Sequence, residues 1–506
     1  MASAIFQLNA EAASSTVEVE VHDGAGSRVF SPGEPFSFDI TATVTSGQFP
    51  AGLGYQWRDF RGKPLGPAVP LAGGVRVSVT SPSDDPQIGY YGLTFLPEDQ
   101  NVAFNQSTGS RREFGFAVLP ARSVSDRPLN AASPFGVVHA DLDDPYLPTW
   151  IKTMTWHTSG PEWWGFEMNR RREKGLLELP LVSGDGWTSD DASPVTGEFI
   201  EALQDKIRRY FKADRKIEHW ELGREENLRS RFEEPRYFAN LKTKTAAVRE
   251  VAEDVNPGIR LLYQVAGRSL TDVKDFLASE AADEFDILAP HPYLWPDFPA
   301  PEEWLEAFID ERRRAMQQAG RNMPMWFTEI GAPQNDARVS QMLSGSARVR
   351  GQARDEHAAY IVKVHVLALA RGIERILWYN YRDRDPSTTD VEDHFGMIDY
   401  WGFPKPAYPA YVTLVRCVEG KAFHGKKELP ENIHVYEYRN ADESCLVAWA
   451  YPAVEQSVPL SAIRPDLAKA NLLTVTNAVG TPLRVSATVS LSEFPVFITA
   501  PSDSVH

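Results

Sequence analysis

Residues 217–222 read Ile-Glu-His-Trp-Glu-Leu, and residues 260–265 read Arg-Leu-Leu-Tyr-Gln-Val. The stretch between them, residues 239–255, has the apolar spacing typical of an amphipathic helix. Strands that alternate with helices in this way predict a parallel sheet, because parallel strands need long crossover connections. The alternation continues from about residue 130 to residue 420, which is the length and rhythm of a TIM (β/α)₈ barrel.

A doubly wound open sheet is the competing architecture for this region. Such sheets carry a glycine-rich phosphate-binding turn after their first strand. The first predicted strand here, Phe135-Gly-Val-Val-His139, is not followed by such a turn. We therefore expect the α/β barrel.

The regions on either side of the predicted barrel are patterned as β-structure. Thr16–Val21 and Phe36–Val44 alternate apolar and polar residues, and Gly, Pro and Ser residues fill the turns between them. The same kind of pattern returns at Ile433–Tyr438 and Ser444–Ala450. We expect an N-terminal β-sandwich over residues 1–128, an α/β barrel over residues 129–418 and a smaller C-terminal β-sandwich over residues 419–506.

The composition excludes several classes of partner. The chain has 506 residues, and 52 Lys and Arg against 69 Asp and Glu give a net charge of −17, which disfavours nucleic acid and anionic membranes. No apolar run approaches the roughly 20 residues of a membrane span. The N-terminus lacks the basic and apolar regions of a secretory signal. We expect a soluble protein that is cytoplasmic or, if a signal was trimmed, periplasmic or secreted.

Neither a metal nor a cofactor is predicted. The sequence has no His-x-x-x-His helix, no phosphate loop and no Gly-x-Ser-x-Gly nucleophile elbow. Its two cysteines, Cys417 and Cys445, are too few for a disulfide scaffold or a zinc site. A single bridge between them stays open, and two buried thiols are the preferred interpretation.

Two predicted strands end in carboxylates. One segment is His219-Trp-Glu-Leu-Gly-Arg-Glu-Glu-Asn227, and the other is Met325-Trp-Phe-Thr-Glu-Ile-Gly331. Side chains alternate along a strand, so each segment can aim a glutamate, Glu225 or Glu329, inward. The active site of a barrel lies at the carboxyl ends of its strands, where these residues are expected.

Both segments resemble the clan A glycoside hydrolases, in order and in strand position, over residues 131–415. The resemblance extends to Asp286-Ile-Leu-Ala-Pro-His-Pro-Tyr293 and to Trp378-Tyr-Asn380. It implies a retaining mechanism in which Glu225 is the acid/base and Glu329 the nucleophile. The flanking β-sandwiches look like those of family 39 and its neighbours. The sequence cannot give the distance between the two carboxylates, which separates retention from inversion.

One residue departs from the pattern of the clan. Arg224 stands where these enzymes usually carry an asparagine that contacts the sugar 2-hydroxyl. Arginine offers a fixed charge and a planar fork of donors, which suits a carboxylate or another polar substituent. Pairing of Arg224 with a nearby acid such as Glu226 is an equally weighted alternative.

Further residues are expected to bind substrate, His291, Tyr293 and Trp378 because the resemblance implies it, and the others because they lie at strand ends or in the loops that follow them. Besides Arg224 they are His291, Tyr293, Trp295, Trp378, Asn380, His139, His157, Asp185 and Trp187. Trp378 is expected to lie under the sugar ring, and Glu221 is expected to make a structural hydrogen bond inside the barrel. The acidic residues Asp383, Asp385, Asp390 and Asp393 lack the spacing of a calcium loop and are expected to be solvated.

Three functions follow from this pattern. Hydrolysis of a β-linked oligo- or polysaccharide with retention is the leading one, with Glu329 ionised so that it can attack. Transglycosylation on the same site is the second. A barrel that binds carbohydrate without catalysis is the third, and the carbohydrate is the expected partner in each.

Overall fold

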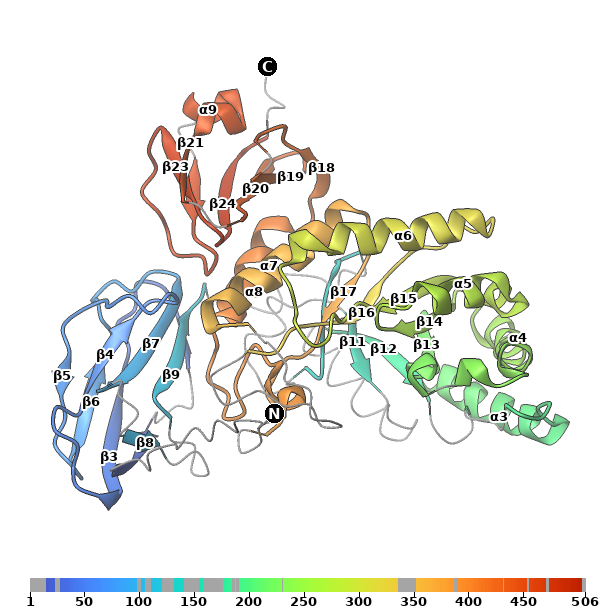
Figure 1. Ribbon diagram of the computed structural model, residues 1–506, viewed down its shortest axis with the longest axis horizontal. Coiled ribbons are helices and arrows are strands. Elements are labelled where there is room, and N and C mark those ends of the chain that lie inside the picture. Colours follow the sequence, from blue (N-terminus) through green and yellow to red (C-terminus); the bar gives the residue numbers. More distant parts are fainter. Residues whose placement is uncertain are drawn as a thin grey trace, which may run out of the picture.

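The computed structural model describes residues 15–22, 28–97, 102–104, 111–120, 132–140, 154–157, 176–183, 187, 191–229, 231–334, 352–385, 390–430, 432–452, 455–469 and 473–502. An N-terminal β region, a central α/β region and a C-terminal β region follow one another along the chain (Figure 1). None of the helices in these ranges combines the length and the apolar character that crossing a membrane requires.

Two sheets form the N-terminal region, with strand orders β6-β3-β1-β8 and β2-β9-β7-β4-β5. The strands are β1 (Ser15–His22), β2 (Val29–Phe30), β3 (Ser37–Gly47), β4 (Gly54–Arg58), β5 (Val69–Pro70), β6 (Arg76–Thr80), β7 (Gly89–Leu96), β8 (Val102–Phe104) and β9 (Glu113–Val118). Alternate residues of β1, such as Val17 and Val19, are buried. Phe38 of one sheet stacks on Phe116 of the other at 4.6 Å between ring centroids. The sheets therefore face each other across an aromatic core.

The central region contains eight parallel strands in the order β15-β14-β13-β12-β11-β10-β17-β16. They are β10 (Phe135–Val138), β11 (Met154–His157), β12 (Leu177–Val182), β13 (His219–Leu222), β14 (Arg260–Ala266), β15 (Ile287–His291), β16 (Phe327–Ile330) and β17 (Ile376–Trp378). Neighbours in the sheet are neighbours in the chain, apart from the step between β10 and β17, so the doubly wound alternative is wrong. The two outer strands also approach each other, because Leu288 N donates to Pro324 O and Trp326 N donates to Leu288 O, both at 3.0 Å.

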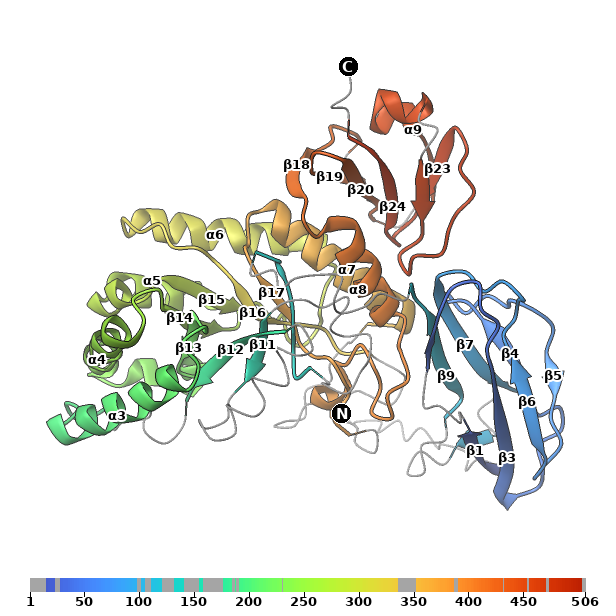
Figure 2. The same ribbon diagram turned by 180° about the vertical axis from the view of Figure 1, so that it is seen from behind.

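Helices connect most of the described strands. They are α3 (Gly197–Ala213), α4 (Tyr237–Val255), α5 (Leu270–Ala278), α6 (Leu305–Gln318), α7 (Arg354–Ala370) and α8 (Ala407–Val418). The Thr196 side chain caps α3 by accepting from Phe199 N at 3.2 Å. The helices α3 to α6 lie outside the strands β13 to β16 (Figure 2). This arrangement leaves the carboxyl ends of the strands free to carry functional side chains.

The C-terminal region has a five-stranded sheet, β18-β19-β20-β24-β22, and a separate pair, β21-β23. The elements are β18 (Ala422–Lys426), β19 (Ile433–Arg439), β20 (Glu443–Ala450), β21 (Gln456–Pro459), α9 (Leu460–Ile463), β22 (Thr474–Thr476), β23 (Thr488–Leu491) and β24 (Val496–Pro501). The region packs on α7, where the Tyr438 hydroxyl donates to Val366 O at 2.7 Å. Cys417 and Cys445 are free thiols, as expected, but only Cys445 is fully buried, and Cys417 is partly buried.

Candidate active site

Glu225 is held in a sharp turn just after β13. Gly223 has φ 79° and Glu225 has φ 46°, so the chain enters the left-handed region twice in three residues. A Cβ at Gly223 would lie 3.1 Å from Trp187 Nε1 and 3.2 Å from the Glu226 carboxyl group. The Glu225 backbone N donates to Gln264 Oε1 at 3.1 Å. Glycine at residue 223 therefore allows the turn to fit, and Gln264 of β14 fixes its far end.

The residue after Glu225 supports this turn from behind. Glu226 begins a short 3₁₀ helix, η3 (Glu226–Arg229), and is buried. Its Oε2 accepts from the Tyr237 hydroxyl at 2.8 Å, and Tyr237 contacts the Tyr263 hydroxyl at 3.1 Å. Arg224, by contrast, is exposed. The arginine side chain is thus available at the rim, one residue before Glu225.

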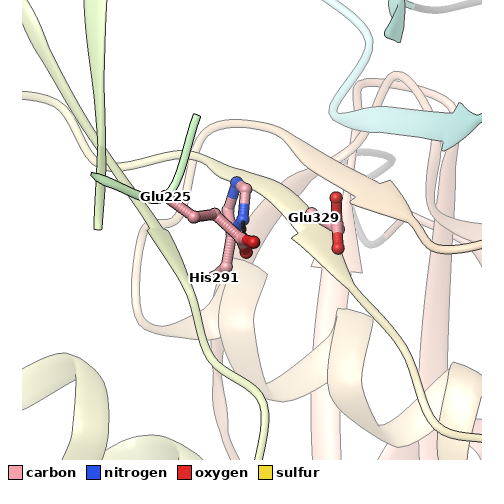
Figure 3. Close-up of side chains that lie close together, drawn as sticks. All are labelled: Glu225, His291 and Glu329. Carbon is pink, nitrogen blue, oxygen red and sulfur yellow. Dashed lines mark hydrogen bonds and ion pairs between the residues drawn. The ribbon is translucent and has the colours of Figure 1, made fainter. Parts of the chain in front are cut away.

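Glu225, His291 and Glu329 lie together (Figure 3). They come from the turn after β13, the end of β15 and the middle of β16. His291 Nδ1 is 2.8 Å from Glu225 Oε1, and the Tyr293 hydroxyl donates to Glu329 Oε1 at 2.8 Å. One oxygen of each carboxylate and one nitrogen of His291 all lie within 4.8 Å of one another. The two predicted glutamates therefore face a common point.

A chain of hydrogen bonds continues behind His291. His291 Nε2 is 2.9 Å from Thr328 Oγ1, and the Thr328 hydroxyl donates to Glu221 Oε1 at 2.6 Å. His291, Thr328 and Glu221 are each fully buried. The internal hydrogen bond expected of Glu221 is confirmed, and its partner is the residue immediately before Glu329.

Burial and charge together shift the titration of the site. Burial alone lowers the pKa of His291, but its hydrogen bond to Glu225 and the charges of Glu329, Glu225 and Glu221 raise that pKa to about 9. Burial raises the pKa of Glu329 to about 7, with Glu225 adding to the shift and His291 and Tyr293 opposing it. In the unliganded protein Glu329 therefore stays partly protonated up to about pH 7. From the sequence, this residue is expected to be ionised. Two partly buried carboxylates this close cannot both ionise easily.

This triad is also the one group of acidic and histidine side chains, among the described residues, with the spacing of metal ligands. Its donors suit a metal poorly. Both ring nitrogens of His291 already lie within hydrogen-bond distance of Glu225 and Thr328. A metal would also have to displace a proton from His291, whose pKa is raised to about 9.

Trp378 is not brought to this point by the structure. It is fully buried and packs against His357, Tyr360 and His365 of α7, with centroids 5.8–6.3 Å away. The next residue, Tyr379, lies on the site side instead, 6.4 Å from the Tyr293 ring. The expected sugar platform is therefore in the helix–sheet core.

The other predicted binding residues are placed as follows. Trp295 is partly buried and packs near Tyr293, with centroids 6.3 Å apart. His139 is exposed after β10, 5.9 Å from the Tyr379 ring. Asn380 is buried next to Tyr379, and Trp187 is buried beside Gly223. Asp185 lies outside the described residues, and of His157 only the backbone, in β11, is described.

Sequence reasoning missed two charged residues after β17, Arg384 and Glu392. Arg384 lies over the Tyr379 ring at 5.2 Å. Glu392 belongs to a short 3₁₀ helix, η7 (Val391–His394), and its negative charge raises the pKa of Glu329. Burial, together with nearby acids that include Glu225, raises the pKa of Glu392 itself. The carboxylate lies in the stretch taken for a solvated loop, and no motif distinguishes it.

The expectation of a solvated acidic loop is wrong for Asp383. This side chain is buried, and its Oδ1 accepts from Lys405 Nζ at 2.7 Å and from Gly396 N at 2.8 Å. The ion pair therefore ties the segment after β17 to the segment that leads into α8.

Comparison with known proteins identifies the fold. No family model matches the chain, and no curated protein matches it. Among solved structures, it is similar to a family 39 glycoside hydrolase from the gut symbiont Bacteroides cellulosilyticus WH2, with a TM-score of 0.65, 17% identity and coverage of 95% of this chain and 100% of the other. A GH30 endoxylanase from Clostridium papyrosolvens C71 matches with a TM-score of 0.47, 11% identity and coverage of 74% and 99%. The chain thus shares the fold of the family 39 structure, which confirms the predicted resemblance at the level of fold.

Proposed function

We propose that this chain is a retaining glycoside hydrolase that cleaves a β-type glycosidic bond in an oligo- or polysaccharide. In this proposal Glu225 is the acid/base and Glu329 the nucleophile. The single observation that carries it is the approach of the two carboxylates, whose nearest oxygens lie within 4.8 Å. Retaining enzymes need carboxyl groups roughly 5–5.5 Å apart, whereas inverting enzymes leave room for a water at roughly 6.5–9.5 Å.

Each step has a side chain in place. Glu329 attacks the anomeric carbon while Glu225 protonates the leaving oxygen, which gives a glycosyl-enzyme. Esterification removes the negative charge of Glu329, so Glu225 ionises more easily and takes a proton from the incoming water. The Tyr293 hydroxyl, 2.8 Å from Glu329 Oε1, stabilises the ionised nucleophile before attack.

The proposal extends to the architecture. We take the eight parallel strands to form a closed (β/α)₈ barrel over residues 129–418, braced by β-sandwich domains over residues 1–128 and 419–506. The hydrogen bonds of Leu288 between β15 and the start of β16 support closure. Contact between Phe114 of β9 and Phe403, at 5.1 Å, supports a bracing role for the N-terminal domain.

The stereochemistry of the product tests the mechanism. We would screen aryl β-glycosides and a glycan library, then follow the anomer formed in the first minutes by proton NMR. The expected product has the β configuration. An α product would show inversion and overturn the double displacement.

Three variants accompany the screen. Glu329→Ala and Glu225→Ala should each lower kcat/KM by at least about a thousandfold. Azide should rescue Glu225→Ala and yield a β-glycosyl azide, because azide attacks the glycosyl-enzyme without a general base. Glu233→Gln, an exposed acid further along the same loop, is the matched control and should leave activity unchanged.

Two other functions remain as outcomes of the same screen. Transglycosylation is favoured if sugar acceptors outcompete water for the glycosyl-enzyme. A carbohydrate-binding barrel is favoured if calorimetry detects sugar binding and nothing is turned over. Arg224→Asn tests whether Arg224 contacts the substrate: unchanged kcat and KM would exclude a direct role.

A further inference from the structure

The two hydrogen bonds that link His291 to Thr328 and Thr328 to Glu221 run in one direction, from donor to acceptor. The Thr328 hydroxyl owns one proton and donates it to Glu221 Oε1 at 2.6 Å. With Glu221 ionised, as the charge of His291 and the Thr328 hydrogen bond favour against burial, its carboxylate can only accept, so this proton is committed. Thr328 Oγ1 can then only accept from His291 Nε2, which is 2.9 Å away.

This direction fixes the tautomer of His291. Nε2 must carry a hydrogen in both the charged and the neutral ring, because it faces an acceptor. The remaining nitrogen, Nδ1, lies 2.8 Å from Glu225 Oε1 and is therefore the one that gains and loses a proton. With the opposite tautomer, Nδ1 would keep its hydrogen in both forms of the ring, so it could neither release a proton to Glu225 nor take one back.

We infer that Thr328 and Glu221 are positioning residues that fix the tautomer of His291, so that His291 Nδ1 stores the proton used by Glu225. The inference rests on the proposed function of Glu225 as acid/base. In the first step the Nδ1–H bond breaks as the proton passes to the Glu225 carboxylate, which then protonates the leaving oxygen. In the second step Glu225 takes a proton from water and returns it to Nδ1, so protons balance over one turnover.

The surrounding negative charges favour the protonated form of His291. Three carboxylates act on His291, namely Glu225 beside it, Glu329 on β16 and Glu221 on β13. They outweigh burial and raise the pKa of His291 to about 9, so the store is filled at neutral pH. Burial raises the pKa of Glu221, while His291 and the Thr328 hydrogen bond oppose that shift.

Nitrogen-15 NMR of the histidine side chains tests the inference without any turnover. The His291 signals would be assigned by comparison with His291→Asn, and the full chain would be titrated from pH 6 to 10. We expect His291 to titrate well above 6.5 and its neutral form to carry the hydrogen on Nε2. Thr328→Val, which keeps the shape and removes the hydroxyl, should abolish that tautomer preference.

Activity gives the second readout. Thr328→Val should lower kcat by about tenfold and move the high-pH limb of kcat down by about one pH unit, because the store empties earlier. Thr328→Ser retains the hydroxyl and should restore both the tautomer and the profile. A loss of stability alone would not move the pH profile and would not separate valine from serine in the NMR spectrum.

The two hypotheses fail differently. If the protein hydrolyses glycosides with retention but neutral His291 carries its hydrogen on Nδ1, the positioning role is overturned and the proposed function stands. If His291 shows the expected tautomer but no glycoside is cleaved, the proposed function fails and the assignment of Thr328 and Glu221 stands. A tautomer unchanged by Thr328→Val also overturns the positioning role.

Discussion

Three carboxylates and one histidine, from β13 and the turn after it, β15 and β16, lie together. Glu225 and Glu329 reach within 4.8 Å of each other and of His291, and Glu221 lies behind them through Thr328. Burial makes it costly for several of these carboxylates to be ionised together. Protons held on the carboxylates and on His291 reduce the net negative charge of the site. The folded site therefore holds protons more tightly than the unfolded chain does, which links its titration to stability.

Stability should fall as pH rises from about 6.5 to 9. The pKa of His291 is raised from 6.5 to about 9 on folding, so its contribution is fully present below pH 6.5 and is lost as pH rises through 9. The full shift corresponds to about 3 kcal/mol in the free energy of unfolding. Thermal unfolding midpoints measured across this range should decline, and His291→Asn should flatten the decline.

Glu329 affects stability over a second pH range, which lies below that of His291. Its pKa is raised from 4.5 to about 7, so its contribution is present below pH 4.5 and is lost as pH rises through 7. Histidines with lowered pKa values, His219, His357 and His365, destabilise the fold only as pH falls below 6.5. Between pH 7.5 and 9 the lowered pKa of the Cys417 thiol acts in the opposite direction, so the comparison with His291→Asn separates the two groups. An equal slope in His291→Asn and the unaltered protein would contradict the raised pKa of His291.

The Tyr293 hydroxyl should control the low-pH limb of activity. Its hydrogen bond lowers the pKa of Glu329 against the effect of burial, so Tyr293→Phe should raise that pKa above about 7. We expect the low-pH limb of kcat/KM to move to higher pH, with about a tenfold loss at pH 6. Tyr379→Phe removes a hydroxyl from the same aromatic group and is the control; equal shifts in both variants would argue against the hydrogen bond.

At the scale of single elements, the sequence predicted the ends of the strands well. It predicted less well which face of the sheet each side chain lies on. The motifs at residues 219–227 and 325–331 predicted β13 and β16, with Glu225 and Glu329 at the site. On β17, however, side chains alternate, and a register difference of one residue moves a side chain to the other face. Trp378 consequently packs on α7 while Tyr379 faces Tyr293. A three-residue strand carries too little pattern to fix its register from sequence.

This register makes Trp378 a stability residue. Trp378→Phe removes volume from a fully buried position against α7 and should lower the unfolding midpoint, with a loss of about 1–3 kcal/mol. KM for the identified substrate should stay within about twofold, since the ring does not reach the carboxylates. Tyr379→Ala should do the reverse and raise KM. A raised KM with an unchanged midpoint in Trp378→Phe would restore the role of sugar platform.

At the scale of the whole molecule, both flanking regions support elements next to the site. Arg111 pairs with Asp399 at 2.6 Å, at the turn that follows Phe395. The C-terminal region contacts η6 (Pro301–Glu303) and α7, where Trp449 Nε1 donates to Glu302 Oε1 at 2.6 Å. Trp378 of β17 packs against α7, and the C-terminal sheet packs on the same helix. A shift of the C-terminal sheet could therefore move β17 through α7. Contacts of this kind join residues far apart in sequence, so no local pattern predicts them.

Glu302 is the residue on which this docking should depend most. Its carboxylate lies 2.7 Å from Lys363 Nζ, and the two side chains are 3% and 6% exposed. Glu302→Gln leaves the Lys363 charge buried without its partner, which costs about 3–5 kcal/mol when a buried pair is broken. The unfolding midpoint should fall, and limited proteolysis should cut near residue 419 more rapidly.

The neighbouring acid is a matched control. Glu303 accepts a hydrogen bond from the Tyr451 hydroxyl at an exposed position, where such contacts contribute little. Glu303→Gln should therefore leave both the midpoint and the proteolysis rate nearly unchanged. If the two variants behaved alike, the buried pair would not hold the C-terminal region in place. If Glu302→Gln also lowered kcat with KM unchanged, the docking would extend through α7 to the strand that carries Tyr379, and the C-terminal region would act on the site as well as on stability.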